Sequence, residues 1–270
     1  MKKRKRKRSV FEWIVILCAC AVTLFVFTAL AFILVEGIPN LKEVVTSQEV
    51  RFAVWLSLWT SLLSTLICLL LGVPAAYAFT RTDMRLRRVC TVIVELPLSV
   101  PNLMIGLSLL LMFSSMPGKY LSSHGIRFIF DVKGIVLAQL MVNMPFLLRI
   151  ARTSFMELDP RLETVAESLG AGRMQTFFQI MLPMAKNGIL GGAVVAWSRA
   201  LGEFGATLMF VGATRMKTET IPTSIYLNMA TGDIGPAMAC AMIILIISAV
   251  TLVLSGFFNQ RPGAKKERKR

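Results

Sequence analysis

The chain has 270 residues, 55% of them hydrophobic, and 30 Lys and Arg residues stand against 15 Asp and Glu residues. No charged residue lies between Arg51 and Arg81, or between Asp233 and Arg261. About 20 apolar residues in a row are enough to cross a bilayer as a helix. The composition therefore argues against a soluble domain, and nucleic acid is a poor explanation for the positive charge.

The chain begins with a basic stretch, residues 1–9, which is followed by an apolar run over residues 10–35. This run is too long for the core of a signal peptide, and no small-residue cleavage pattern follows it. We interpret it as an uncleaved first membrane span with its basic end in the cytoplasm. Residues 10–258 are predicted to form one transmembrane domain, and residues 259–270 a second basic cytoplasmic tail.

Hydropathy predicts an all-α membrane protein with six transmembrane helices. We expect them over residues 10–35, 52–80, 91–115, 134–153, 184–211 and 236–258. The third span carries Pro97 and Pro101, so its start should be kinked or non-helical. Such breaks are tolerated where neighbouring helices or water satisfy the freed backbone groups.

The positive charges test this topology. The segments predicted to be inside hold about three times as many Lys and Arg residues as those predicted to be outside, as the positive-inside rule expects. Both termini and the loop at residues 158–183 are then cytoplasmic.

The loop at residues 158–183 is polar and rich in turn residues, although it lies between two apolar regions. Asp159 and Pro160 are typical of a helix start. The helix should run to about Leu169 and end at Gly170 and Gly172, because glycine readily adopts the positive φ that closes a helix. A second amphipathic segment is expected to follow and to end at Pro183.

The spacing from Gly170 through Ile180 to Leu182 and Pro183 resembles the EAA-loop signature of ABC importer permeases. Where that family has Glu-Ala-Ala, this chain has residues 164–166, Thr-Val-Ala, and Glu163 stands one position early. Whether Glu163 takes the acidic role is left open. The resemblance implies a coupling helix, between spans four and five, that fits a cleft on a cytoplasmic ATPase. The implied coupling residues are Glu163, Ala166, Gly170, Ala171, Ile180, Leu182 and Pro183. A loop helix without a partner is the alternative.

Catalytic patterns are missing from the sequence. There is no G-x-x-x-x-G-K-[ST] phosphate loop, the single histidine, His124, lies in a predicted outer loop, and the five cysteines lack metal-ligand spacing. We therefore expect no enzymatic activity and no bound metal or cofactor in this chain. The resemblance implies a transport subunit, with ATP and Mg bound by the partner ATPase.

Residues 197–212 place two charges, Arg199 and Glu203, inside an otherwise apolar span. An intramembrane charge costs roughly 2.5–3.5 kcal/mol on insertion scales. Because the two residues are four positions apart, their side chains are predicted to lie on one face of the helix and to pair. The pair either fixes helix packing or, together with Pro97 and Pro101, lines a translocation path or gate, where Arg199 would attract an anion.

The stretch RALGEFGAT, the loop that follows it and the two prolines resemble permeases of molybdate, tungstate and sulfate importers. The resemblance implies a pore in a prokaryotic cell membrane for an oxyanion, with molybdate or tungstate favoured. It also implies an external oxyanion-binding protein and a second permease subunit, either another copy of this chain in a homodimer or a close relative. An ABC permease for sulfate, thiamine, iron or phosphate is one alternative, and a carrier or channel that needs no ATPase is another.

Overall fold

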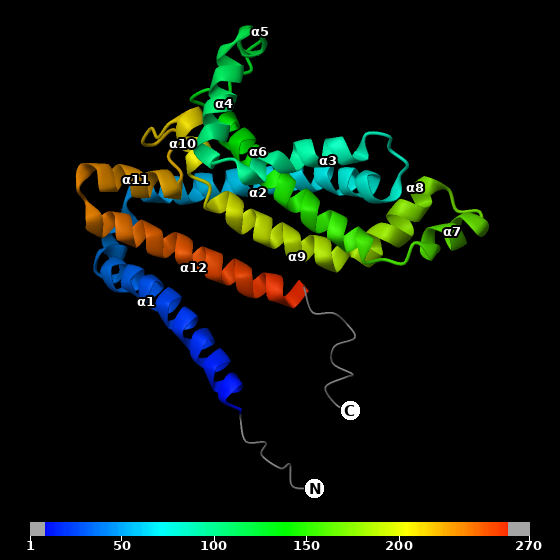
Figure 1. Cartoon of the computed structure of the whole chain (residues 1–270). Coiled ribbons are helices and arrows are strands. Elements are labelled where there is room, and N and C mark those ends of the chain that lie inside the picture. The colour runs from blue at the N-terminus through cyan, green and yellow to red at the C-terminus, as the bar shows by residue number, and fades with distance from the viewer. Residues whose placement is uncertain (1–8, 259–270) are drawn as a thin grey trace.

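The computed structural model of the protein describes residues 9–258, and over this range the chain is helical without a β-strand (Figure 1). The two predicted basic tails lie outside the described residues, except for Ser9. The long helices are α1 (Val10–Thr46), α2 (Gln48–Arg81), α6 (Val132–Met156), α9 (Leu182–Leu201) and α12 (Ile234–Phe258). The shorter elements are α3 (Arg87–Glu95), a 3₁₀ turn (Leu96–Ser99), α4 (Asn102–Ser114), α5 (Met116–Ser123), α7 (Arg161–Ser168), α8 (Arg173–Gln175), a π-helical turn (Thr176–Met181), α10 (Gly205–Val211) and α11 (Ile221–Thr231).

Within the described residues, five helices are long and apolar enough to cross a membrane, and a bent pair makes a sixth span if it counts as one. This agrees with the six predicted spans. The first helix is longer than its predicted range, because α1 continues through Pro39 to Thr46. Most of its large apolar side chains are exposed, as expected for a helix that faces lipid.

The third span is broken, as its prolines predict. The helical stretch over residues 87–99 and α4 meet at an angle of 113°. Pro97 lies in the 3₁₀ turn, and Pro101 immediately precedes α4. Proline fixes φ and has no N–H to donate, so two of them in five residues prevent a continuous helix.

The predicted fifth span, residues 184–211, is wrong as a single helix. α9 ends at Leu201, and the chain turns before α10 begins at Gly205. The Glu203 carboxylate accepts a hydrogen bond from the Ala206 backbone N–H at 2.8 Å, which satisfies a free donor in the first turn of α10.

The helix is also not interrupted at Pro183, where the second amphipathic segment of the loop was expected to end. A helical run from Arg173 to Leu201 passes through this position. Pro183 lies in the first turn of α9, directly after the π-helical turn, where the hydrogen-bond pattern changes and a missing N–H disturbs it least.

Helix α2 packs against α6 and α9 in the interior of the bundle (Figure 1). Its contact face is made of small hydroxyl residues that let helix backbones approach closely. The Thr60 hydroxyl donates to its own helix at Leu56 O, and Trp197 of α9 donates from Nε1 to Ser61 Oγ at 2.9 Å. Figure 1 shows α7 and α8 at one end of the bundle and α11 at the other, so these segments are separated by the length of the spans.

Candidate functional site

The helix α7 has the boundaries that the sequence predicts. Asp159 Oδ1 accepts from the Arg161 N–H at 2.9 Å, which satisfies a free donor of the first turn. At the other end, the Ala171 N–H donates to the Ala166 carbonyl at 3.0 Å. Gly170 makes this closure with a φ of +86°, in the left-handed region that favours glycine.

The predicted coupling residues of α7 face different ways. Ala166 is buried, and Ala171 is half-buried. A Cβ added at Gly170 would meet nothing within 4 Å, so this position opens to the surroundings. Glu163 instead turns towards the bundle, where its Oε1 lies 3.7 Å from Arg81 Nε.

The environment of Glu163 disfavours its charged form. Burial raises the pKa of Glu163 above its usual value, and the neighbouring Glu167 adds to the effect. Arg81 and Tyr77 act in the opposite direction. The side chain of Glu163 is only 20% exposed, so it contributes little to the outer surface of α7.

The remaining coupling residues join the loop to α9. Ile180 lies in the π-helical turn and is half-buried, while Leu182 packs against the cluster that contains Phe155 and Met181. Pro183 is exposed. The segment Gly170–Pro183 thus connects an open surface at α7 to a transmembrane helix through a π-helical turn, an element often found at functional positions.

An exposed apolar surface lies at this end, and we did not predict it from the sequence. Its members are Val165 at 56% exposure, Leu169 at 83%, Met174 at 74% and Phe178 at 54%. Met174 lies between Arg173 and Gln175, and Leu169 follows Ser168; such isolated apolar residues in a polar loop were the available signal. A cluster of large apolar side chains outside the predicted spans is typical of a surface that binds another protein.

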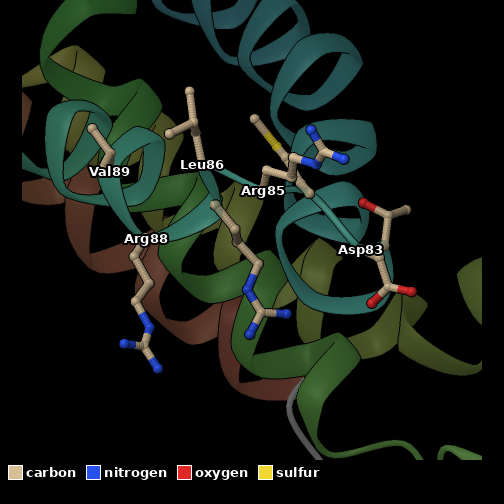
Figure 2. Close-up of a pocket in the computed structure, with 8 residues that line it drawn as sticks. Asp83, Arg85, Leu86, Arg88 and Val89 are labelled. Atoms are coloured by element: carbon tan, nitrogen blue, oxygen red, sulfur yellow. The ribbon is translucent and has the colours of Figure 1, made fainter.

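The turn between α2 and α3 carries positive charge. It forms an open hollow of about 670 Å³ lined by residues 82–89. Figure 2 shows Arg85, Leu86, Arg88 and Val89 around it, with Asp83 on one side. The hollow lies at the end of α2 that contacts α7, so basic side chains gather at the same end as the exposed apolar surface.

A second arrangement lies where the two broken spans meet. Asn102, the first residue of α4, donates from Nδ2 to Glu203 Oε2 at 2.8 Å, and the other carboxylate oxygen caps α10. Glu203 is 4% exposed. One carboxylate therefore holds together the break after Pro101 and the break after Leu201. Asn102 was not predicted, because nothing local marks it as the partner of a residue 101 positions away.

Two glycines bring the same helices into contact. A Cβ added at Gly106 of α4 would lie 2.5 Å from the Ala206 carbonyl oxygen, and one at Gly205 would lie 3.1 Å from the Leu103 nitrogen. At position 106 only glycine allows this approach of α4 to α10, and at position 205 a larger residue would require its neighbours to shift. Of the predicted path residues, Pro101 and Glu203 border this junction through Asn102, and Pro97 lies in the adjacent 3₁₀ turn.

The predicted pairing of Arg199 with Glu203 is wrong. No ion pair joins them in the described part of the chain, because α9 ends between them and Glu203 is directed to α4. Arg199 is exposed, and its guanidinium carbon lies 4.8 Å from the ring centre of Phe146 on α6. This cation–π contact holds a positive charge at the surface of the bundle.

Comparison with known proteins gives matches over most of the chain. Residues 69–263 match the family model described as binding-protein-dependent transport system inner membrane component. The probable transport system permease protein NifC of Clostridium pasteurianum is 36% identical over 242 residues, which are 88% of this chain and 84% of that protein. The molybdenum transport system permease protein ModB of Escherichia coli is 36% identical over 208 residues, 75% of this chain and 90% of that protein.

A further relative is the molybdate/tungstate transport system permease protein WtpB of Pyrococcus abyssi, 34% identical over 221 residues, 76% of this chain and 84% of that protein. Among solved structures, the chain resembles a bacterial alginate ABC transporter with a TM-score of 0.74 at 18% identity, over 93% of this chain and 95% of that one. It also resembles the MetNI methionine ABC transporter, with a TM-score of 0.60 at 18% identity, over 77% and 91%. These two likenesses concern the fold.

Proposed function

Because the chain belongs to the family of binding-protein-dependent transport system inner membrane components, we propose that it is the pore-forming permease of an ATP-driven importer for molybdate or tungstate. The substrates named for ModB and WtpB support this assignment, and the chain spans 84–90% of the length of these relatives. As a permease it is a transport component, and the chemistry of ATP hydrolysis belongs to a separate subunit.

The exposed apolar surface at α7 is the observation that carries the coupling part of the proposal. Val165, Leu169 and Met174 are more than half exposed on a loop that the positive-inside rule assigns to the cytoplasm. A cytoplasmic ATPase subunit would cover these side chains, and Gly170 leaves room for the close approach. ATP and Mg bind to that subunit, whose closure displaces α7.

The junction of Glu203 and Asn102 supports an assignment of the translocation path. It joins two broken spans, and broken helices at membrane depth are typical of transport sites. Arg199 is exposed in the single chain and offers a positive charge to an oxyanion. A second copy of the chain, in a homodimer, would enclose the path between two such faces.

The two ends of the helix bundle lie on opposite sides of the membrane in this proposal. The end with α7 and the arginines of the α2–α3 turn faces the cytoplasm, together with both termini, in the cell membrane of a prokaryote. The opposite end, with α11, receives the oxyanion from an external binding protein.

A matched pair of variants at Gly170 tests the docking surface. Gly170→Ala and Gly170→Trp carry the same strain from the positive φ, roughly 1–2 kcal/mol, but only Trp adds bulk to the open surface. In proteoliposomes with the partner ATPase and binding protein, we expect Gly170→Ala to transport and Gly170→Trp to lose ATP-driven uptake. Normal uptake by Gly170→Trp would overturn the docking assignment.

Substrate is tested in the same proteoliposomes by the uptake of labelled molybdate, tungstate and sulfate. We expect the first two to be imported and sulfate to compete weakly. Import of sulfate alone would favour the sulfate alternative. Import that persists without the ATPase would identify the chain as a stand-alone carrier.

A further inference from the structure

Arg81, the last residue of α2, connects three segments at the end of the bundle. Its side chain is 9% exposed. Nη2 donates to the Phe155 carbonyl at 2.5 Å and to the Leu158 carbonyl at 2.6 Å. These carbonyls lie in the last turn of α6 and just beyond it, where helix carbonyls lack intrahelical partners and carry partial negative charge.

The third contact of Arg81 is with α7. Its Nε lies 3.7 Å from Glu163 Oε1, in the first turn of that helix. This oxygen is buried and has no hydrogen-bond partner among the described residues. The contact is therefore an ion pair that a small movement of either helix would shorten into a direct hydrogen bond.

Tyr77 lies one turn before Arg81 on α2 and adds aromatic contacts to α6 and to the π-helical turn that leads into α9. Its ring centre is 5.5 Å from that of Phe155 on α6 and 4.8 Å from that of Phe177 in the π-helical turn. Arg81 and Tyr77 thus bring the end of α2 against α6, α7 and the segment that leads into α9. A displacement of α7 therefore acts on a point where the ends of α2 and α6 meet.

We propose that Arg81 is the positioning residue that attaches the coupling helix α7 to α2 and α6, so that a docked partner that displaces α7 moves both transmembrane helices. This inference rests on the proposed function. It also gives Glu163 a role inside the permease, as the anchor of α7, and leaves the docking surface to the exposed apolar residues.

Arg81→Gln, Arg81→Lys and Arg85→Gln test the attachment in the complete complex. Arg85 is exposed in the adjoining turn and makes no ion pair or hydrogen bond among the described residues, so it serves as the matched control. We expect Arg81→Gln to raise the ATP hydrolysed per oxyanion imported by about 5-fold or more, the lower end of typical coupling between sites. Arg81→Lys keeps the charge but not the planar fork of donors, so its effect should be intermediate, and Arg85→Gln should match the wild type.

A merely structural role for Arg81 would lower the melting temperature of Arg81→Gln and leave the ratio of ATP to oxyanion at the wild-type value. That result would overturn the proposal. Hydrogen exchange over residues 161–168 of the full-length permease alone gives a readout that needs no ATPase. Faster exchange in Arg81→Gln, but not in Arg85→Gln, supports the attachment, and unchanged exchange overturns it. If the wild-type complex imports no oxyanion, the proposed function fails, while hydrogen exchange still decides whether Arg81 holds α7.

Discussion

Two junctions in this protein use a carboxylate to hold a short helix to its neighbours, but they do so in different surroundings. At the predicted cytoplasmic end, Glu163 is 20% exposed and lies 3.7 Å from Arg81 without a hydrogen bond to it. Between the broken spans, Glu203 is 4% exposed and accepts two hydrogen bonds of 2.8 Å, from Asn102 and the Ala206 N–H.

The difference teaches where this fold can move. A buried carboxylate with both oxygens hydrogen-bonded is expensive to disturb, because each freed group would be left unsatisfied. The junction of α4 and α10 is in addition closed by glycines at backbone contact. The α7 junction has a longer contact, and its carboxylate side chain is 20% exposed, so we expect it to adjust while the interior junction moves as a unit.

The largest expected effect comes from filling the interior contact. In Gly106→Ala the new Cβ would meet the Ala206 carbonyl oxygen at 2.5 Å and its Cα at 2.8 Å, so α4 and α10 must separate. The free energy of unfolding should fall by about 1–3 kcal/mol, as for other overpacked sites. Denaturant unfolding in detergent measures it. Gly256→Ala, where a Cβ meets nothing within 4 Å, is the control and should be neutral or slightly stabilising.

A coupling energy of comparable size should distinguish the Glu203 junction from the Glu163 junction. A double-mutant cycle with Glu203→Ala and Asn102→Ala should give a coupling energy of about 1–3 kcal/mol, because the bond is buried and charge-assisted. The same cycle with Glu163→Ala and Arg81→Ala should give about 0.2–1 kcal/mol, as for a partly exposed ion pair. A coupling energy for Glu163 and Arg81 that equals or exceeds that for Glu203 and Asn102 would refute the difference between the two junctions.

The smallest expected effect is a pH dependence at Glu163. Because burial raises the pKa of Glu163 in the folded chain above its usual value of 4.5, the folded chain holds the proton more tightly than the unfolded chain. The free energy of unfolding should then fall as the pH rises from 4.5 through the raised pKa, and level off above it. Melting temperatures of the wild type and of Glu163→Gln, measured across this pH range, isolate the part of the pH dependence that comes from Glu163. A difference that grows in the opposite direction would contradict the burial of this carboxyl.

Several features of the protein follow from local sequence. The spans are recognisable because a bilayer of fixed thickness demands about 20 apolar residues. The boundaries of α7 follow from Asp159 at its start and Gly170 at its end, since capping acts within a few residues. The break in the third span follows from Pro97 and Pro101, because the restriction that proline places on the backbone is also local.

Other features depend on residues that meet only in the folded chain. The break in the predicted fifth span, the true partner of Glu203 and the inward turn of Glu163 towards Arg81 involve residues from different helices, up to 101 positions apart. Exposure of Leu169 is likewise a property of the assembled bundle. The sequence by itself therefore determined the membrane class, the number of spans and the loop helix, because bilayer partition and helix capping are local. Tertiary structure decided which charged group contacts which partner, because helix packing sets those distances.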